Sequence, residues 1–216
     1  MSNRGDLKRE LGIASLAFCT CSLARNAHAD PTAGDRGGKL DVVGTFGMIA
    51  PATSDYRSNA NGLGYDRQGW RWLYQLEVAA LFRPGWFGLG DALSIGPNVR
   101  ATYGRLGAPY DSVPTIDTDA LLIGATIEAR ISRFPVVFLW TDLDAGAAWV
   151  GPVGAHQTSL AWSARVGPGL RFGSEQLAGR LRVGYEYTPA GTFGTLGSLD
   201  LGGLFFSFDG VFRALD

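Results

Sequence analysis

The sequence predicts an all-β protein, a closed eight-stranded antiparallel transmembrane β-barrel preceded by a cleavable signal peptide. Three observations lead to this fold class. The first residues follow the order of an export signal, most of the remaining chain alternates apolar and polar residues, and the connections between alternating segments are mostly long and short in turn. No run reaches the roughly 18 apolar residues that a membrane-spanning helix needs. A membrane span in this chain would therefore be made of strands.

The N-terminal residues form the predicted signal peptide. Arg4, Lys8 and Arg9 give a positive start, an apolar stretch runs from Leu11 to Ala24, and Ala27-His28-Ala29 is a small-x-small cleavage site. A short anchor helix is the alternative, but this apolar stretch is shorter than a membrane span. We therefore expect three parts: a signal peptide at 1–29, a periplasmic lead at 30–39 and an outer-membrane barrel at 40–216.

Both cysteines, Cys19 and Cys21, lie in the predicted signal peptide. A lipoprotein signal is a second alternative, but such a signal has a small residue before the cysteine, where this chain has Phe18 and Thr20. Once the signal is removed, the chain has no cysteine and therefore no disulfide and no thiol chemistry.

The predicted mature chain is one domain in length and nearly neutral. The signal contains four of the 19 basic and two of the 20 acidic residues, which leaves 15 basic and 18 acidic residues. Only one of those 15 is a lysine, Lys39, whereas soluble proteins of this size usually carry many surface lysines. The chain also lacks the basic excess that is typical of nucleic-acid-binding proteins, so we expect no nucleic-acid partner.

Eight segments alternate with a period of two, which is the spacing of side chains on the two faces of a β-strand. The first four are Leu40 to Ala50, with Val42 and Phe46 on the apolar face; Trp70 to Arg83, with Tyr74 and Leu76 opposite Gln75 and Glu77; Leu93 to Gly104, with Val99 and Tyr103 opposite Asn98 and Arg100; and Asp119 to Ile131, with Leu121 and Ile123 opposite Thr126 and Glu128.

The second half of the chain repeats this pattern. Its segments are Val136 to Val150, with Leu139 and Leu143 opposite Asp142 and Asp144; Ser159 to Phe172, with Trp162 and Leu170 opposite Ser163 and Arg165; Leu177 to Tyr187, with Leu181 and Val183 opposite Arg180 and Arg182; and Leu199 to Arg213. The last segment changes phase at Phe205-Phe206, which predicts a bulge. Each segment has about the length of a tilted membrane strand.

The connections support a barrel with long loops on one side and short turns on the other. Ser132 to Pro135 and Gly173 to Gln176 are tight, whereas Arg105 to Thr118, Gly151 to Thr158 and Thr188 to Ser198 are long or rich in Gly and Pro. The second connection, Pro84 to Ala92, is longer than a tight turn. We expect both termini on the short-turn side.

The tight turn from Gly173 to Gln176 also fixes a register, because residues whose numbers sum to about 351 should face each other. It places Arg165 opposite Glu186 as a buried pair. It also places Gly169 opposite Arg182, with room for the guanidinium, and Arg171 opposite Arg180 as a like-charge pair near the rim. A slip of one residue would turn every side chain of one strand to the wrong face.

Two prolines, Pro97 and Pro168, fall inside predicted strands, where proline removes a ladder hydrogen bond. Both follow a glycine, in Gly96-Pro97 and Gly167-Pro168. We expect both to lie in bulges near the short-turn rim, because bulges concentrate at barrel rims.

The apolar face is expected to point outward, towards lipid. The polar face carries Arg, Asp and Glu among glycines, as in a narrow lumen, and aromatic residues gather at the strand ends in two belts, as at bilayer interfaces. A soluble barrel with an apolar interior is the alternative. The belts are Trp70, Trp72, Tyr103, Trp149, Trp162, Tyr185 and Tyr187 on the long-loop side and Phe82, Phe172, Phe206, Phe208 and Phe212 on the short-turn side.

Over the whole predicted mature chain, this pattern resembles the small outer-membrane barrels of the OmpA/OmpX type. The last strand, Phe206 to Phe212, is similar to the alternating aromatic signal that the barrel-assembly machinery reads in that family, although this chain ends in Arg213-Ala214-Leu215-Asp216. The resemblance implies a location in the cell outer membrane of a Gram-negative bacterium. It also implies three partners: the lipid bilayer, lipopolysaccharide and the assembly machinery.

Charged residues on the inward face could fill the interior with salt bridges, line a gated conduit, or act as acid and base catalysts. Filling is the favoured interpretation, since eight strands enclose a space just wide enough for side chains and buried charges must be paired. The residues are Arg71, Glu77, Arg100, Glu128, Arg130, Asp142, Asp144, Arg165, Arg180, Arg182 and Glu186.

The sequence offers little for catalysis or metal binding, so we assign no catalytic, cofactor or metal residue and expect no enzyme activity. Lipid A-modifying barrels of similar size use a histidine with a serine and an acid, but here His156 and Ser159 have no glutamate nearby, and a solvated loop histidine is the simpler interpretation. One histidine without cysteine cannot form a transition-metal site. Loop aspartates such as Asp111, Asp117 and Asp119 could bind calcium, but without a specific pattern.

Two functions remain open from the sequence. One is a structural or surface-interaction role, in which the extracellular loops carry any binding. The other is a narrow transport conduit that passes a small solute through the barrel or laterally out of it.

Overall fold

The structure is a computed structural model that describes residues 39–51, 72–83, 92–106, 116–131, 134–152, 156–174, 176–192 and 198–215. These residues form ten strands. The strands are β1 (Lys39–Pro51), β2 (Leu73–Arg83), β3 (Leu93–Leu106), β4 (Ile116–Ile131), β5 (Phe134–Pro152), β6 (Gln157–Gly173), β7 (Leu177–Tyr187), β8 (Pro189–Thr192), β9 (Ser198–Asp200) and β10 (Gly203–Leu215). The predicted signal peptide at 1–29 lies outside these residues.

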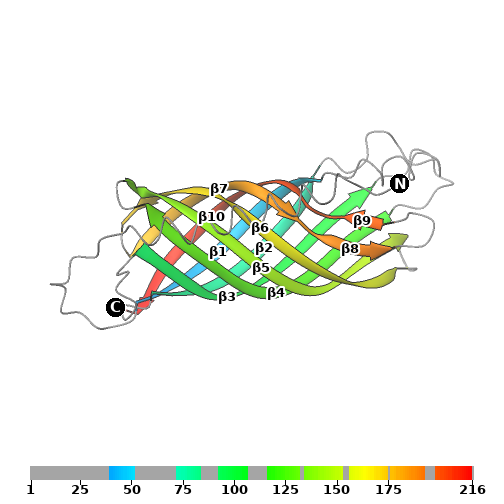
Figure 1. Ribbon diagram of the computed structural model, residues 1–216, viewed down its shortest axis with the longest axis horizontal. Helices are drawn as coiled ribbons and strands as arrows, with labels where there is room; N and C mark the ends of the chain where they lie inside the picture. The colour runs from blue at the N-terminus through cyan, green and yellow to red at the C-terminus, as the bar shows by residue number, and fades with distance from the viewer. Residues whose placement is uncertain are drawn as a thin grey trace, which may run out of the picture.

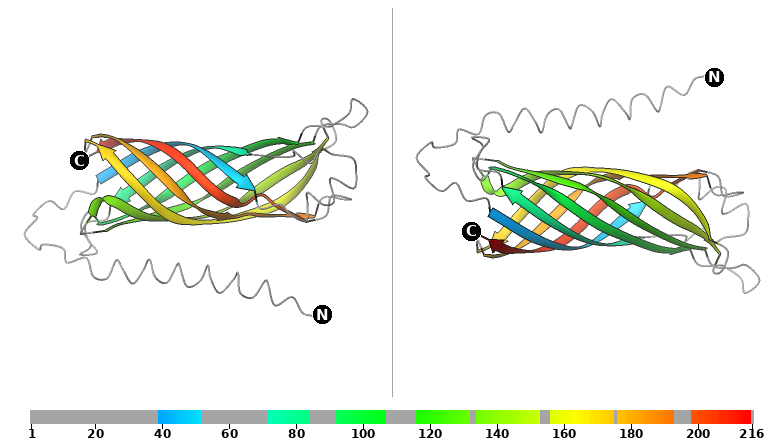
Figure 2. Two further views of the ribbon diagram at one scale, coloured as in Figure 1. Left: turned by 90° about the horizontal axis from the view of Figure 1, so that it is seen from above. Right: turned by 90° about the horizontal axis from the view of Figure 1, so that it is seen from below.

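Eight of these strands close into one barrel, in the order β1-β10-β7-β6-β5-β4-β3-β2. Every neighbouring pair is antiparallel, and the strands run strongly tilted around the barrel (Figures 1 and 2). The start of β1 and the end of β10 meet at one end, where Leu40 faces Leu215. That end also holds the tight connections β4–β5 and β6–β7. The predicted closed antiparallel barrel of eight strands is confirmed.

Exposure alternates along the strands as the pleat requires, because successive side chains point to opposite faces of a sheet. On β2, for example, the side chain of Leu76 is 63% exposed and the next residue, Glu77, is 3% exposed. Apolar side chains face outward and most charged ones face inward, the reverse of a soluble barrel. No helix among the described residues is long and apolar enough to cross a membrane.

The register predicted for the two strands joined by the tight turn is confirmed. Arg165 faces Glu186, Gly169 faces Arg182, and Arg171 faces Arg180. The turn itself is closed by a backbone hydrogen bond from the Ser174 amide to the Leu177 carbonyl, 2.9 Å long. A short turn leaves little freedom for the pairing to slip, which is why this register follows from the sequence.

The bulge predicted at Phe205-Phe206 is wrong. The pairing of β10 with β7 and with β1 runs through both residues without a shift. Phe205 simply points inward and is fully buried, while Phe206 points outward with 40% of its side chain exposed. The sequence suggested a change of phase only because a large aromatic residue occupies an inward position that was expected to be polar.

The bulges predicted at the two prolines are also wrong, because the register between the paired strands is the same before and after each proline. Pairing of β3 with β2 stops after Asn98 and resumes at Ile95, and pairing of β6 with β7 stops after Val166 and resumes at Gly169. Each proline keeps its pairing with the strand on its other side. Proline therefore interrupts one ladder without adding a residue.

The Gly-Pro steps depend on the glycine as well. A Cβ at Gly96 would lie 1.7 Å from the Ala80 carbonyl oxygen, and one at Gly167 would lie 2.0 Å from the Val183 carbonyl oxygen. The neighbouring strands approach so closely here that no side chain fits, and the interrupted ladders lie beside these contacts.

The long-loop end holds more strand than expected. The predicted loop from Thr188 to Ser198 contains β8, which pairs with β9 as a separate two-stranded sheet. Asp200 ties this hairpin to the barrel, since its Oδ1 accepts hydrogen bonds from the backbone amides of Thr188 (3.1 Å) and Gly202 (2.8 Å). Strands β5 and β6 also continue into the predicted loop from Gly151 to Thr158.

The interior is not uniformly polar. One apolar cluster runs from the long-loop end to Phe138 and Trp140 on the short-turn half of β5, and a second one lies towards the short-turn end. Buried arginines lie against the aromatic rings of the first cluster. The first cluster includes Ile49, Leu73, Leu122, Val150 and Leu201, and the second is Val43, Ala79, Leu81, Ala178 and Val211.

Candidate functional site

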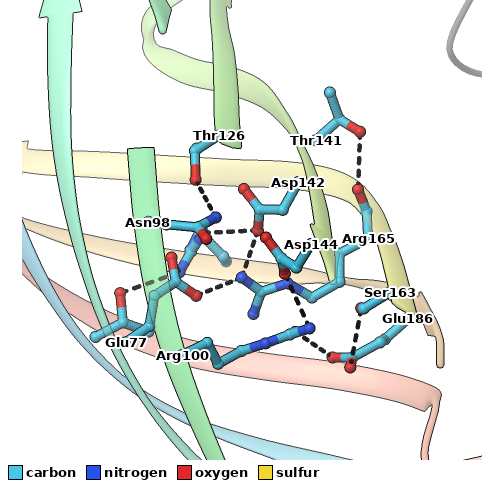
Figure 3. A network of polar contacts seen from close by, with 12 residues as sticks. Glu77, Asn98, Arg100, Thr126, Thr141, Asp142, Asp144, Ser163, Arg165 and Glu186 are labelled. Carbon is cyan, nitrogen blue, oxygen red and sulfur yellow. Dashed lines mark hydrogen bonds and ion pairs between the residues drawn. The ribbon is translucent and has the colours of Figure 1, made fainter. Parts of the chain in front are cut away.

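The centre of the barrel is crossed by ion pairs between strands on opposite sides (Figure 3). Arg100 on β3 reaches Glu186 on β7, which lies four strands away in a ring of eight, with 2.9 Å between Nη1 and Oε2. Its Nη2 lies 2.9 Å from Oδ2 of Asp144 on β5. Both side chains of the Arg100–Glu186 pair are almost fully buried. This guanidinium therefore spans the lumen.

A second arginine spans the lumen in the same way. Arg165 on β6 pairs with Glu77 on the opposite strand β2 and with Asp142 on the neighbouring strand β5. Arg182 joins this group through Glu77, at 3.4 Å, and reaches Asp209 on β10 at 2.9 Å. The carboxylates are shared between arginines, so the pairs form one connected network.

The pairing corrects one sequence-based expectation. Arg165 and Glu186 face each other in register and on the inward side, as predicted, but each has other ion-pair partners. Glu186 pairs with Arg100 and also accepts hydrogen bonds from Gln75 (3.0 Å), Thr188 (2.6 Å) and Ser163 (3.3 Å). A residue opposite in register lies beside its partner, whereas a long arginine side chain reaches across the lumen.

Aromatic rings fill the space between the arginines. The guanidinium carbon of Arg182 lies 4.8 Å from the ring centroid of Trp140, and that of Arg165 lies 4.9 Å from the ring centroid of Phe205. The two rings contact each other edge to face, with centroids 5.4 Å apart. The Trp140 indole N–H donates to the carbonyl of Pro168 at 3.1 Å. Cation–π contacts of this kind strengthen when water is excluded.

Two inward glycines leave room for aromatic rings, where room for arginines was expected. A Cβ on Gly169 would lie 2.3 Å from the ring of Phe138, its register partner on β5. A Cβ on Gly184 would lie 3.0 Å from the ring of Trp140. The sequence does indicate that these rings point inward, because Phe138 and Trp140 alternate along β5 with the outward residues.

Carboxylates outnumber guanidiniums in this central network. Four arginines face six acids, all of them buried. A buried charge without a counter-charge is unfavourable, so an imbalance of two must be offset by polar groups, protons or ions. The arginines are Arg100, Arg165, Arg180 and Arg182, and the acids are Glu77, Glu128, Asp142, Asp144, Glu186 and Asp209.

The predicted inward charges are placed as expected where the structure describes them. Arg130 lies near the short-turn end of β4, where it faces Phe138, and Arg71 lies outside the described residues. A further group at the short-turn rim was missed: Asp41 pairs with Arg83, with Arg213 at 3.3 Å and with Arg171 at 3.6 Å. It was missed because two of its members lie at strand ends, where alternation is weak.

The histidine and serine of the third long loop do not form a catalytic pair. His156 is exposed, and the Ser159 hydroxyl donates to the backbone carbonyl of Leu160 at 3.3 Å. Of the aspartates considered for calcium, Asp117 is bound by Arg105, with 2.6 Å between Nε and Oδ1, and Asp111 lies outside the described residues.

The arrangement can hold a fixed interior. Both apolar clusters and the ion-pair network consist of buried side chains. The exposed side chains of the described residues lie at the ends of the barrel and on its outer wall.

No family model matches the chain, and no curated protein matches it. Several solved structures are similar in fold. Neisserial surface protein A is 15% identical, with a TM-score of 0.41, and the match covers 82% of this chain and 95% of that one. Ail, the attachment invasion locus protein of Yersinia pestis, in complex with the heparin analogue sucrose octasulfate, is 12% identical, with a TM-score of 0.39 and coverage of 82% and 96%.

The N-terminal β-barrel domain of OprF from Pseudomonas aeruginosa is a third such structure. It is 14% identical, with a TM-score of 0.33, and the match covers 82% of this chain and 99% of that one. Because these identities and TM-scores are low, the functional assignment rests on the geometry of this chain alone.

Proposed function

We propose that this chain is an integral outer-membrane β-barrel protein of a Gram-negative bacterium, with a structural or surface-interaction role. The observation that carries the proposal is the inverted polarity of the barrel, whose outer wall is apolar and whose centre is charged. Only a lipid environment makes an exposed apolar band favourable. A closed barrel also leaves no sheet edge unpaired in the membrane.

The exposed aromatic residues support a bilayer position. Trp72, Tyr103, Trp162 and Tyr185 are exposed towards the long-loop end, and Phe82, Phe172 and Phe212 towards the short-turn end. Phe206 and Phe208, which the sequence placed in the short-turn belt, are exposed nearer the middle of β10. Aromatic side chains of this kind favour the two bilayer interfaces. Trp70 of the predicted belt lies outside the described residues.

The filled interior supports a role at the surface over a conduit along the axis. In this proposal the extracellular loops carry any binding, lipopolysaccharide and the bilayer surround the wall, and the barrel-assembly machinery inserts the chain. Enzyme activity is not part of the proposal.

Planar-bilayer conductance of the refolded protein tests the choice between the two roles. We expect no steady conductance above that of protein-free bilayers, because buried apolar side chains and the ion-pair network fill the centre of the barrel. Stable single-channel openings in the unmodified protein would overturn the surface-interaction role in favour of a conduit. Heat-modifiable migration on a detergent gel shows in the same sample that the barrel is folded.

A further inference from the structure

The barrel closes where its first strand, β1, meets its last, β10, and the pairing at the short-turn end of this seam is irregular. Along most of β1 the register is continuous, and Asp41 faces Arg213 in the last regular pair. The register then shifts by one residue, so that Leu40 faces Leu215 and Ala214 is passed over. An extra residue disrupts a ladder locally. The backbone therefore holds this end of the seam less firmly than its middle.

Asp41 lies at this weak point and binds three arginines that come from three other strands. It pairs with Arg83 on the neighbouring strand β2 and with Arg213 on β10, where Nε and Oδ1 are 3.3 Å apart. It also pairs with Arg171 on β6, across the barrel mouth, at 3.6 Å. The side chains of Asp41, Arg83 and Arg213 are buried. The contact with Arg213 is the one that crosses the seam.

Arg213 is held on its other side by the tight turn between β6 and β7. Its backbone amide donates a hydrogen bond to the carbonyl of Gln176, 3.0 Å long. On the opposite side of Asp41, β1 and β2 stay in continuous register down to Lys39, which faces Arg83. Asp41 therefore joins a firmly paired part of the sheet to a strand end that is anchored at a turn.

The charges at this point make the carboxylate important for holding the strands together. Asp41 is the counter-charge that Arg83, Arg171 and Arg213 share. Without it, three guanidiniums that converge on one point would repel one another, and a buried charge that loses its partner is unfavourable. Repulsion between Arg83 on β2 and Arg213 on β10 would push apart the strands on either side of β1.

We propose that Asp41 is a latch for the barrel seam, which holds the end of β10 against β1 at the short-turn mouth. When the latch is released, the ends of β1 and β10 part, while the middle of the seam stays paired through its continuous ladder. This device keeps the sheet closed, and it does not depend on what the long loops bind.

Hydrogen–deuterium exchange of the protein folded in lipid vesicles, measured by mass spectrometry, tests the latch. Asp41→Asn should speed the exchange of amides at 42–43 and 211–212 by about tenfold or more, because a buried ion-pair cluster loses its acid and the strand ends open locally. Amides at 45–49, in the middle of the seam, should keep their rates. The same rates in Asp41→Asn as in the unmodified protein would overturn the latch.

Two matched variants each remove one guanidinium and keep the carboxylate, so they test the latch even if Asp41→Asn does not fold. Arg213→Gln breaks the contact across the seam and should speed exchange at 42–43 and 211–212 by about tenfold. Arg171→Gln breaks a contact across the mouth and should leave these rates unchanged.

Equal exchange at the seam in Arg213→Gln and Arg171→Gln would overturn the latch, because the cluster would then add to stability without holding the seam. Faster exchange along the whole of β1 in Arg213→Gln would overturn it as well, since the opening would not be local. Heat-modifiable migration is recorded for every sample. A normal shift with unchanged exchange contradicts the latch alone, whereas the absence of a shift in the unmodified protein contradicts the barrel and with it the proposed function.

Discussion

At the scale of single residues, stability depends on which charges are shared across the lumen. Glu186 is almost fully buried and holds Arg100 together with three neutral donors, whereas Asp144 contacts an arginine that Glu186 also binds. Acids exceed arginines in this network, so the two carboxylates should not be equally important. Removing one partner of a buried pair is costly when the remaining charge has no other partner.

Glu186→Gln should lower the free energy of unfolding by about 3 kcal/mol, because Arg100 donates a hydrogen bond to Glu186 whereas its contact with Asp144 is not a hydrogen bond, so the guanidinium loses its hydrogen-bonded counter-charge. The measurement is urea unfolding of the protein folded in lipid vesicles, followed by tryptophan fluorescence. An unchanged unfolding midpoint would contradict the ion-pair network as the source of this stability.

Asp144→Asn should change the free energy of unfolding by about 1 kcal/mol or less, because Arg100 keeps Glu186 and the excess of buried acids falls by one. The same unfolding experiment measures it, so the two variants are controls for each other. A loss as large as that of Glu186→Gln would show that the surplus of acids is offset in another way.

At the scale of elements, a large inward side chain on one strand lies opposite a small residue on the neighbouring strand. Gly169 on β6 and Phe138 on β5 are register partners, and the ring of Phe138 occupies the place of the missing side chain. Gly184 on β7 faces Phe205 on β10 in register, and the ring beside its missing side chain is that of Trp140 on β5. Alternating large and small residues in this way fills a narrow barrel without strain.

Gly169→Val should destabilise the barrel by about 1–3 kcal/mol, the usual range for overpacking, because its Cβ would meet the ring of Phe138. Adding Phe138→Ala should restore part of this loss, since it frees the space beside the new side chain. Unfolding midpoints of the two single variants and the double variant give the coupling. Strict additivity would mean that the two residues do not share this space.

At the scale of the whole molecule, the barrel is a membrane protein only if the chain is exported, and the predicted signal peptide lies outside the described residues. The inverted polarity of the barrel requires delivery to a bilayer. Cleavage after Ala29 would leave a short polar lead before β1, which starts at Lys39. The lead would then lie at the short-turn end, with the end of β10.

Mass spectrometry of the protein extracted from outer membranes should show the loss of residues 1–29 and a new N-terminus at Asp30. Ala29→Asp should block the cleavage, because the site requires small residues, and should leave the unprocessed chain in the inner-membrane fraction. A mature protein that retains Leu11 to Ala24 would be anchored instead and would contradict delivery to the outer membrane.

The sequence by itself determined which side chains point outward and which strands are neighbours, because a period of two and short turns are local properties. The alternation predicted the outward position of Leu76 and the inward position of Glu77, and the tight turn predicted the register that places Arg165 opposite Glu186. Only the tertiary structure decided that Arg100 binds Glu186, that Phe138 fills the space at Gly169, and that aromatic rings pack between the buried arginines. These contacts join strands far apart in the ring or depend on side-chain volume, and both are set when the sheet closes with a particular stagger.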